Sequence, residues 1–523
     1  MSLPSVVKSS PRAALFTPTD VLEATGGHWV QGSHQAALCP APVHTDTRSL
    51  EPGDWFLALA GERWDGHNFL QQAVEAIYES AGKPGGLIIH HESALEALNL
   101  PEAMPVVRVS HTTWAYLALG AYHRQRLPQV TVIALTGSNG KTTAKELLLA
   151  ALSPVCRVQA TAKNHNNEIG VAQTLCSLTP ETDVLIVEMG MRGLGQIEPL
   201  SQAAQPNVAA VLNVGPAHIG LLGSLEAIAR AKSEIFTGLS SRPSTFCSKP
   251  TAVVWGDDPL LWDSTLQAPT LEVQKALPSS VPYDFIPVFA FQAQAVVTGP
   301  DGVEFDRVET DCSTRIQLGL PGFHAIQNAL LVLAMGQCLG FSSHQLAPGL
   351  ASYHPVEGRW HPAFCHHPQT CQPIHLIQDA YNANPASMMA GLETLHQMVS
   401  PHDRILLVLG GMKELGEWSE HYHNALGQWL ANSPQAAHTH WVLVGEEMEP
   451  VQKLIVEKGF QPQLHCVAGP LQPFALQKLV FELQECLATV LPTPGVWWVY
   501  VKGSRFYQLD VVAAQLQAAL DPV

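Results

Sequence analysis

The stretch Val130-Thr-Val-Ile-Ala-Leu-Thr-Gly-Ser-Asn-Gly-Lys-Thr-Thr143 decides the fold of this chain of 523 residues. Its first part is an apolar run typical of a buried strand, and the pattern after it predicts a helix over residues 143–152. A glycine-containing turn between a strand and a helix lets backbone N–H groups face an anionic phosphate. We therefore predict a phosphate-binding loop, in which Lys141 reaches the β- and γ-phosphates and the Thr142 hydroxyl binds Mg²⁺. An ordinary strand–helix turn is the alternative, and the Lys-Thr-Thr sequence disfavours it.

Two further apolar runs extend this unit. Residues 183–188 and 208–213 are near-continuously apolar and alternate with helical patterns. Such runs are typical of a parallel sheet that is covered on both faces. Glu188 ends the first run, and a carboxylate at the carboxyl end of a strand beside a phosphate loop is a candidate metal ligand. A solvated glutamate at a strand end is the alternative.

Pattern and turn signals divide the chain into three segments. In the first, strands are expected at 55–59 and 86–90, with a helix over 69–80 between them. The last segment has apolar runs separated by helical patterns, which predicts a second open α/β sheet with ligands at the carboxyl ends of its strands. We expect an α/β protein of three domains: a small α/β N-terminal domain over 1–105, a central phosphate-loop ATPase domain with a parallel sheet over 106–357, and a C-terminal Rossmann-like domain over 358–523.

Composition excludes several classes of protein. Lysine and arginine number 28 and aspartate and glutamate 45, a net charge of −17, and charged residues make up 14% of the chain. A disordered chain needs low hydrophobicity and high charge, and a general nucleic-acid binder needs a basic balance. No run reaches the roughly 18 apolar residues of a membrane span, and no secretory signal is recognised. The ten scattered cysteines favour reduced thiols, so a soluble cytoplasmic protein is expected.

Several motifs point to one family. The loop 136–143 is tighter than the general phosphate loop, because Leu135 stands where that pattern has a glycine. It resembles the ATP loop of the Mur ligases and the folylpolyglutamate synthetases. Downstream, Val187-Glu-Met-Gly190, Ala217-His218 and Ala231-Lys-Ser-Glu-Ile-Phe236 resemble, in this order, the central domain of the Mur ligase family.

The resemblance implies ATP as cofactor, with two Mg²⁺ ions. In the family the matching glutamate and histidine bind Mg²⁺, and the matching lysine is often carbamylated, which turns a cation into an oxygen ligand. The implied metal ligands are Thr142, Glu188, His218 and a carbamylated Lys232, and the implied catalytic residues are Lys141, His218 and Lys232. By composition alone, one histidine among 24 and one helical lysine would be structural or solvated.

ATP contacts are expected in the phosphate loop and at two places further along the chain. The stretch Leu320-Pro-Gly-Phe-His324 with Asn328 resembles a family element near the adenine, although Ala325 replaces an asparagine. Asp379 ends a predicted strand, where a carboxylate can accept hydrogen bonds from ribose hydroxyls. The expected ATP-binding residues are Gly137, Ser138, Asn139, Gly140, Lys141, Thr142, Thr143, Asn328 and Asp379.

Other motifs indicate one branch of the family. Asp379-Ala-Tyr-Asn-Ala-Asn-Pro385 nearly matches the Asp-Ser-Tyr-Asn-Ala-Asn-Pro of the branch that adds D-alanyl-D-alanine, whereas branches that add diaminopimelate or lysine carry an Asp-Asn-Pro-Arg type of motif. The amide-rich stretch 161–170, which by itself indicates only turns, resembles the loop that faces the muramoyl peptide. Gly410-Gly-Met-Lys-Glu-Leu-Gly-Glu417 resembles another family motif, with Gly411 in place of an aspartate, and Trp255 stands where asparagine is usual.

Both ends of the chain carry implied substrate contacts. Residues 46–48, 58–62 and 65–69 resemble the UDP-binding N-terminal domain of the family, and Lys502-Gly-Ser-Arg505 matches a family motif whose cations suit anionic groups. The implied substrate-binding residues are Thr47, Arg48, Asn164, Asn166, Asn167, Tyr381, Asn382, Asn384, Lys502, Ser504 and Arg505.

The resemblance implies an ATP-dependent amide ligase that joins D-alanyl-D-alanine to UDP-N-acetylmuramoyl-tripeptide through an acyl phosphate, acting as a monomer without nucleic acid or a membrane span. The alternatives are another Mur-type ligase, which adds diaminopimelate or lysine, a folylpolyglutamate synthetase, or a nucleotide-dependent switch without ligase turnover. The group Cys365, His366, His367, Cys371 and His375 fits no standard zinc spacing, and a connecting loop is expected there.

Overall fold

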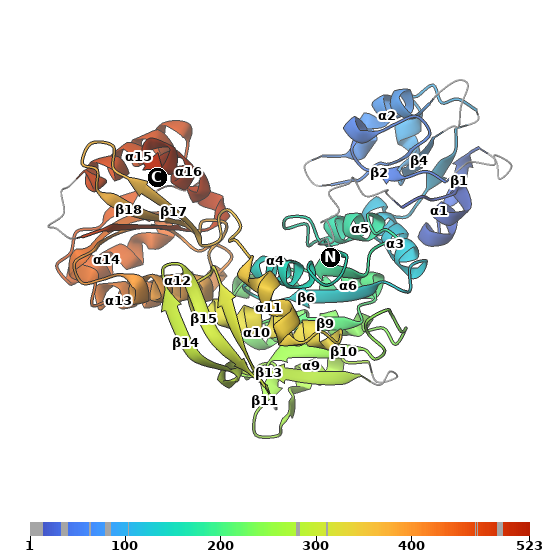
Figure 1. Cartoon of the computed structure of the whole chain (residues 1–523). Coiled ribbons are helices and arrows are strands. Elements are labelled where there is room, and N and C mark those ends of the chain that lie inside the picture. The colour runs from blue at the N-terminus through green and yellow to red at the C-terminus, as the bar shows by residue number, and fades with distance from the viewer. Residues whose placement is uncertain are drawn as a thin grey trace.

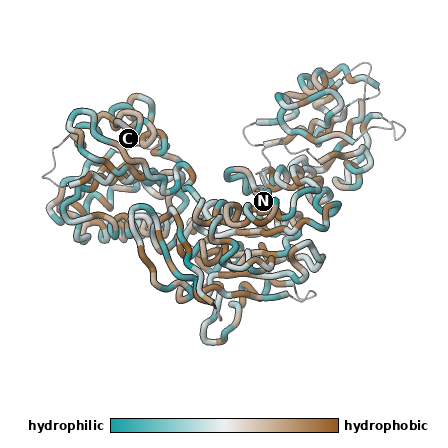
Figure 2. Tube along the Cα trace, in the orientation of Figure 1, coloured by the Kyte–Doolittle hydropathy of each residue, from teal (hydrophilic) through white to brown (hydrophobic). Residues whose placement is uncertain are grey.

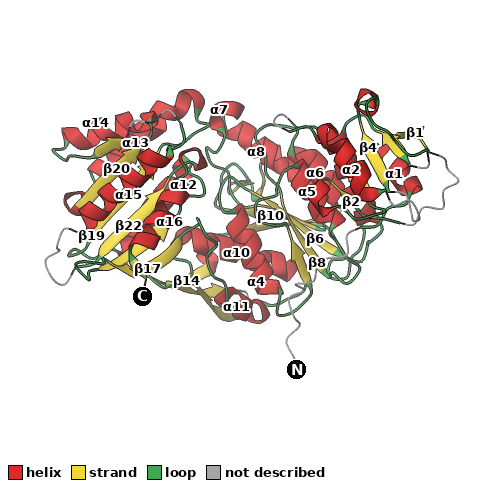
Figure 3. Ribbon diagram, turned by 90° about the horizontal axis from the view of Figure 1, so that it is seen from above, coloured by secondary structure: helices red, strands yellow, loops and turns green. Residues whose placement is uncertain are grey.

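The computed structural model describes residues 14–32, 40–61, 64–78, 85–102, 104–278, 283–309, 312–465, 467, 469–488 and 495–522. Glu62 of the predicted UDP-binding motif lies outside the described residues. Figure 1 shows three lobes, in which the N-terminal and C-terminal lobes stand on opposite sides of a central one, and Figure 3 shows the same order from above. Figure 2 shows hydrophobic segments in all three lobes. The fold class is therefore confirmed as α/β with several sheets.

The first lobe is a five-stranded sheet in the order β1-β5-β4-β3-β2. Strands β2 to β5 run parallel, and β1 pairs antiparallel with β5 at the edge. Strand β5 begins just after the predicted domain boundary at 105 and yet pairs with β4, while the boundary itself stays a prediction. The elements are α1 (Pro18–Thr25), β1 (His28–Gln31), β2 (Val43–His44), β3 (Trp55–Leu57), α2 (Leu70–Ile77), β4 (Gly86–Ile89) and β5 (Val106–Arg108).

The central lobe is a parallel six-stranded sheet in the order β13-β10-β9-β6-β8-β7. All residues of β6 and β8 are buried, as the continuous apolar runs predicted. The elements are α3 (Thr112–Gln125), β6 (Thr131–Thr136), α4 (Lys141–Leu152), β7 (Val158–Ala160), α5 (Glu168–Cys176), β8 (Val184–Glu188), α6 (Ile197–Ala204), β9 (Val208–Val211), α7 (Ile219–Leu222), α8 (Leu225–Ser233), β10 (Thr251–Trp255), β11 (Trp262–Asp263), β12 (Ala268–Pro269), α9 (Leu271–Ala276) and β13 (Asp284–Val288).

An antiparallel sheet and two helices complete this lobe. Strands β14 (Ala293–Gly299), β15 (Gly302–Val308) and β16 (Ser313–Leu318) pair in sequence order, and α10 (Phe323–Cys338) and α11 (Ser343–Ala351) follow. Alternate residues of β15 are buried, among them Val303 and Phe305, which is the period of a strand with one covered face. Helix α10 is buried along most of its length and contacts α4 and β10.

The C-terminal lobe is a seven-stranded sheet in the order β21-β20-β19-β22-β18-β17-β23. The first five strands in this order are parallel, and β17 runs antiparallel to both its neighbours. Ile405, Leu407 and Leu409 face the buried side chains of α12 to α14, whereas Leu406 and Val408 face those of α15 and α16, so helices cover both faces. The elements are β17 (His361–His366), β18 (Pro373–Gln378), α12 (Pro385–Met398), β19 (Arg404–Gly410), α13 (Ser419–Ala431), β20 (Thr439–Val444), α14 (Glu449–Glu457), β21 (Gln463–His465), α15 (Pro473–Leu487), β22 (Trp497–Lys502), α16 (Leu509–Ala519) and β23 (Asp521–Pro522).

The fold shows where the cysteine and histidine group of residues 365–375 lies, and whether a helix could span a membrane. Cys365 and His366 lie in β17 and His375 lies in its partner strand β18 rather than in a connecting loop, and His375 stacks on Trp498 at 4.3 Å between ring centroids. The expectation of a loop at these three positions was wrong, because both segments are strands of the C-terminal sheet. In the described ranges, no helix combines the length and the apolar character that crossing a bilayer requires.

Candidate active site

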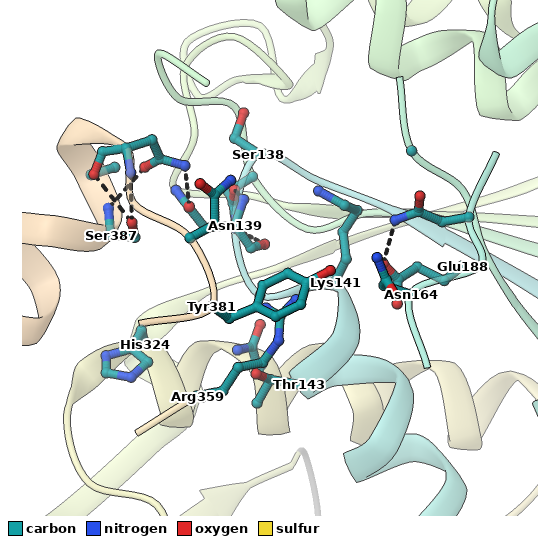
Figure 4. Close-up of a pocket in the computed structure, with 18 of the residues that line it drawn as sticks. Ser138, Asn139, Lys141, Thr143, Asn164, Glu188, His324, Arg359, Tyr381 and Ser387 are labelled. Atoms are coloured by element: carbon teal, nitrogen blue, oxygen red, sulfur yellow. Dashed lines mark hydrogen bonds between the residues drawn. The ribbon is translucent and has the colours of Figure 1, made fainter. Parts of the chain in front are cut away.

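A cavity of about 910 Å³ lies between the central and C-terminal lobes. Figure 4 shows residues of both lobes around it, with Ser138, Asn139 and Lys141 from one and Tyr381 and Ser387 from the other. Many predicted site residues line this cavity: Ser138, Asn139, Gly140, Lys141, Thr143, Asn164, Asn166, Asn167, Glu188, His218, Asn328, Asp379, Tyr381, Asn382, Asn384 and Lys502. Segments that are up to 364 residues apart in the sequence therefore meet at one place, since 502 − 138 = 364.

The predicted phosphate loop connects β6 to the N-terminus of α4. The helix begins at Lys141, two residues earlier than the pattern indicated. The first N–H groups of a helix have no acceptor within the helix, so they can face a ligand. Gly140 has φ +78°, and a Cβ there would lie 2.7 Å from Asn328 Oδ1, so only glycine fits between the loop and α10. The Lys141 Nζ donates to the Gly137 carbonyl at 2.7 Å.

The loop is fastened to the segment that follows β9. Asn139 N donates to Asn213 Oδ1 at 2.9 Å, and Asn213 Nδ2 donates back to the Asn139 carbonyl at 3.1 Å. The Ser138 hydroxyl donates to the Gly215 carbonyl at 2.9 Å. These bonds fix the backbone of the loop without using the N–H groups at the start of α4.

Glu188 lies at the end of β8 and is 1% exposed. Its carboxylate accepts hydrogen bonds from the Thr142 hydroxyl at 3.0 Å and from Asn166 Nδ2 at 2.8 Å. Two of the predicted metal ligands are thus in contact, and the amide-rich loop reaches the same carboxylate. A hydroxyl and a carboxylate beside a phosphate loop are the oxygen donors that Mg²⁺ takes, with waters and phosphates completing its shell. The residues present fit that ion.

Lys232 is buried in α8, with 2% of the residue exposed. In the described part of the chain its ammonium group has no hydrogen-bond or ion-pair partner. Burial lowers the pKa of Lys232 well below its usual value, and the charge of nearby Lys141 lowers it further. Burial also lowers the pKa of Lys141, and although Glu188 opposes this shift, Arg359 adds to it. The neutral amine is therefore favoured at Lys232.

His218 follows β9 in a left-handed conformation, with φ +63°. Its Nδ1 lies 2.5 Å from the Glu414 Oε2 of the C-terminal lobe, and Arg192 lies 3.8 Å from the other oxygen of that carboxylate. The hydrogen bond from His218 lowers the pKa of Glu414, so the carboxylate is ionised. Across the described residues, no group of three or more His, Cys, Asp and Glu side chains is close enough to hold a metal by itself.

Half-buried Asp379 and buried Lys502 form an ion pair at the carboxyl ends of β18 and β22. Lys502 is 2% exposed, and its Nζ lies 2.6 Å from Asp379 Oδ2, which also accepts from Tyr500 at 2.9 Å. Both residues line the cavity. Burial raises the pKa of Tyr500 well above its usual value, and the Asp379 charge adds to the shift. The predicted ribose acceptor is therefore already held by a cation and a hydroxyl.

Tyr381 carries two cations on its ring. The Arg359 guanidinium lies 4.2 Å from the ring centroid and the Arg505 guanidinium 5.3 Å. Asn384, the N-cap of α12, donates to Asn139 Oδ1 at 2.6 Å and so joins the C-terminal lobe to the phosphate loop. Asn382 contributes its carbonyl, which lies 3.5 Å from Lys502 Nζ.

Some predicted residues do not line the cavity. Thr142, Lys232 and Gly137 are not among the lining residues. Ser504 is buried and accepts from the Phe506 N–H, so its hydroxyl caps a turn. Thr47 and Arg48 lie in the N-terminal lobe, where Thr47 donates to Gln72 and Arg48 pairs with Asp46 at 2.6 Å.

Sequence reasoning missed several lining residues. Arg359 lines the cavity and repels Lys141, and it lies near the start of the third segment, outside every motif. Asn213 is the last residue of the apolar run 208–213, and it holds the phosphate loop. A polar residue at the carboxyl end of a parallel strand is the signal that could have found Asn213. A lone arginine in a junction carries no such signal.

Comparisons with known proteins give the family of this chain. The family model described as the Mur ligase middle domain matches residues 135–336, and the one described as Mur ligase, glutamate ligase domain matches residues 365–472. The UDP-N-acetylmuramoyl-tripeptide–D-alanyl-D-alanine ligase of Synechocystis is 37% identical over 391 residues, 74% of this chain and 75% of that protein. The ligase of the same name from Escherichia coli is 36% identical over 386 residues, 74% and 78% of the two chains. The crystal structure of MurF from Acinetobacter baumannii superimposes with a TM-score of 0.76 at 30% identity, covering 97% of this chain and 100% of that one.

Proposed function

This chain belongs to the Mur ligase family, among the ATP-dependent ligases that join D-alanyl-D-alanine to UDP-N-acetylmuramoyl-tripeptide, and from this premise we propose how its residues carry out that ligation. The observation that carries the proposal is the cavity in which the phosphate loop faces the Asp379–Pro385 motif, with the Asn139–Asn384 hydrogen bond between them. Peptidoglycan precursor synthesis is the process that the reaction serves.

ATP is proposed to bind in this cavity with its phosphates on the free N–H groups at the start of α4. Lys141 exchanges its bond to the neutral Gly137 carbonyl for a bond to a charged β- or γ-phosphate oxygen, which is stronger because both partners are ionised. Asn328 lies against the loop, and Asp379 keeps acceptor capacity for ribose hydroxyls. Gly137, Ser138, Asn139, Gly140, Thr142 and Thr143 complete the proposed ATP contacts.

Two Mg²⁺ ions are proposed to be held by Thr142, Glu188, His218 and a carbamylated Lys232. Bound there, Mg²⁺ would neutralise phosphate charge during transfer. Only a neutral amine can attack CO₂, forming the N–C bond and releasing one proton. The burial of Lys232 and the repulsion from Lys141 both favour that neutral amine, which supports carbamylation. The product carbamate is an anion, and it would relieve the repulsion between these two lysines.

The reaction is proposed to run in two steps. An oxygen of the tripeptide carboxylate attacks the γ-phosphorus in line, the bond to the β-phosphate oxygen breaks, and ADP leaves from an acyl phosphate. The amine of D-alanyl-D-alanine then attacks the acyl carbon, orthophosphate leaves with the bonding electrons, and the amine loses a proton. Lys141 and Arg359 supply the positive charge that the chain itself directs at the transferred group.

Substrate groups are proposed to divide between the lobes. Thr47 and Arg48 bind the UDP end, and the amide-rich loop with Asn164, Asn166 and Asn167 binds the peptide. Tyr381, Asn382, Asn384, Lys502, Ser504 and Arg505 bind the dipeptide that enters. We also propose that the protein acts as a monomer in the cytoplasm, a reducing compartment that fits the buried free thiols of Cys156, Cys176, Cys247 and Cys365.

Orthophosphate release by the full-length enzyme tests the proposed mechanism. With ATP and UDP-N-acetylmuramoyl-tripeptide, steady release is expected only after D-alanyl-D-alanine is added, because the acyl phosphate waits for the amine. Release that is indifferent to the dipeptide would contradict the proposal and favour a nucleotide-dependent switch. Release that starts with diaminopimelate or lysine and a shorter precursor would favour another branch of the family.

A further inference from the structure

We infer that Glu414 is the positioning residue for His218, and that the C-terminal lobe completes the proposed metal site by supplying it. The inference rests on the proposed role of His218 as a metal ligand. Glu414 belongs to Gly410-Gly-Met-Lys-Glu-Leu-Gly-Glu417, a motif for which the ligation steps above have no use. It lies 196 residues from His218 in the sequence and in a different lobe.

The hydrogen bond fixes which imidazole nitrogen is available. A carboxylate accepts hydrogen bonds, so His218 Nδ1 is the nitrogen that carries the proton and donates to Glu414 Oε2 at 2.5 Å. In the neutral ring Nε2 then keeps its lone pair. His218 is one of the residues that line the cavity, so a ligand in the cavity has access to this ring. A carboxylate behind a metal-binding imidazole fixes the tautomer and the orientation of the ring.

Both residues of this contact have a strained backbone conformation. His218 and Glu414 both have φ +63°, a left-handed conformation that non-glycine residues adopt at a cost. Each side chain is thereby presented to the other across the lobe boundary. Arg192, which follows β8, lies 3.8 Å from the second oxygen of Glu414. The acid is thus held between the segments that follow two strands of the central sheet.

The backbones of the two lobes also touch at this point. Gly220 N donates to the Glu414 carbonyl at 3.1 Å. A Cβ at Gly220 would lie 2.4 Å from Gly416 N, so the approach needs a residue without a side chain. The C-terminal lobe therefore brings the Glu414 carboxylate to His218 when its backbone contacts Gly220. A lobe that swings away leaves His218 without its partner.

Mn²⁺ binding to the full-length enzyme tests the inference without relying on turnover. The dissociation constant is measured from the electron paramagnetic resonance signal of free Mn²⁺, with ADP present. Glu414→Gln keeps the size of the side chain and removes its charge, and it is expected to weaken Mn²⁺ binding about 10-fold or more. His218→Asn, which tolerates the left-handed backbone, is expected to weaken it at least as much. Glu417→Gln is the matched control, because this exposed acid is three residues away in the same segment.

The double variant shows whether Glu414 acts through His218. If it does, His218→Asn with Glu414→Gln binds Mn²⁺ no more weakly than His218→Asn alone. Losses that multiply would mean that Glu414 acts on its own, and the inference would be overturned. Unchanged binding in Glu414→Gln together with weakened binding in His218→Asn would also overturn it, while the proposed metal role of His218 survived. Unchanged binding in His218→Asn would remove the metal role itself, and the inference with it.

A variant of the lobe contact gives an independent check that leaves both side chains in place. Gly220→Ala is expected to weaken Mn²⁺ binding in the same direction as Glu414→Gln, because the added methyl group separates the two backbones. Gly193→Ala is the matched control, since a Cβ at that glycine would meet only the end of the Gln196 side chain. Normal Mn²⁺ binding by Gly220→Ala would contradict the link between docking and metal binding.

Discussion

The predicted binding residues are held differently in two regions of the molecule. One region is the cleft between the central and C-terminal lobes, and the other is the N-terminal lobe. In the cleft, Lys141, Glu188 and Asp379 are buried or half-buried and hydrogen-bonded, the two carboxylates to side chains from distant parts of the chain. In the N-terminal lobe, the Arg48 side chain is 85% exposed and pairs with its sequence neighbour Asp46. In the described part of that lobe, no residue lines the cavity.

This difference indicates that the cleft carries out the catalytic steps and that the N-terminal lobe contributes to substrate binding. Groups that stabilise charge in a transition state must be held in place before the reaction, and the cleft meets that requirement. An exposed arginine that is paired within its own turn can bind a phosphate, but it cannot direct charge at a reacting group, so it serves affinity. Substitutions of the charged groups in the cleft should therefore lower kcat, and substitutions in the N-terminal lobe should raise the KM of the UDP-linked substrate alone.

Replacement of Lys141 is expected to have the largest effect. Lys141→Met removes the cation at the phosphate loop and should lower kcat about 10³-fold, which is the scale for one preorganised charged donor. Orthophosphate release with all three substrates measures it. Lys275→Met, at an exposed lysine of α9, is the control and should leave kcat unchanged. A Lys141→Met enzyme with a normal kcat and a raised KM would show that this lysine acts in substrate binding. The cleft and the N-terminal lobe would then not differ in the way proposed.

Replacement of Lys232 by methionine should lower activity about 10²-fold and yet raise the melting temperature by a few degrees. The methionine fills the same space without burying an amine that lacks a partner among the described residues. Because the folded-state pKa of Lys232 lies below 10.5, the unfolded chain binds more protons in the interval between the two values. The unfolding free energy of the parent protein should therefore rise with pH through that interval, and Lys232→Met should lose this rise.

Thermal melting in CO₂-free buffer at several pH values checks the stability effect, since carbamylation is suppressed there. The matched comparison is Lys145→Met in α4, which is also fully buried but donates to the Thr161 and Lys163 carbonyls. Loss of these bonds should lower the melting temperature. If both lysine variants shifted the melting temperature in the same direction, the conclusion that Lys232 has no partner within the described ranges would be wrong.

Replacement of Arg48 should act on binding only. Arg48→Ala is expected to raise the KM of UDP-N-acetylmuramoyl-tripeptide about 10-fold, which corresponds to one charge-assisted contact, and to leave kcat and the KM of ATP unchanged. Arg108→Ala removes a comparable exposed arginine of the same lobe, which pairs with Glu92, and should change nothing. A fall in kcat for Arg48→Ala would show that the N-terminal lobe takes part in the chemistry.

The smallest effect is expected at the bond between the two lobes of the cleft. Asn384→Ser keeps a side-chain oxygen for the cap of α12, but it is too short to reach Asn139. Loss of one hydrogen bond of about 1 kcal/mol should raise the KM of ATP about five-fold. Steady-state kinetics with ATP varied measures this. Ser387→Ala is the matched control, because it removes a hydroxyl from the same turn and leaves the bond between Asn384 and Asn139 in place.

Local patterns were sufficient for the parts of the fold that depend on a single element. The apolar runs of β6 and β8 and the turn before Lys141 are local, and they were predicted within two residues. The antiparallel sheet β14 to β16 was not predicted, although the alternation of Val303 and Phe305 with polar residues carries a strand period. A short alternating run is ambiguous until its partner strand is known.

The candidate site divides in the same way. Glu188 could be chosen because a carboxylate at a strand end beside a phosphate loop is a local pattern, and His218 and Lys232 rested on the family resemblance. The pairing of His218 with Glu414, and the position of Arg359 beside Tyr381, depend on how two lobes meet. Nothing in the spacing of one sequence encodes a contact across 196 residues.

The most direct test of the account is the mass of the product formed by the full-length enzyme. One UDP-N-acetylmuramoyl-tripeptide is offered with ATP and a mixture of D-alanyl-D-alanine, D-alanine, diaminopimelate and lysine. The account predicts a single new product, heavier than the tripeptide by D-alanyl-D-alanine less one water. A product that carries another acceptor, or ATP hydrolysis without any product, would contradict it.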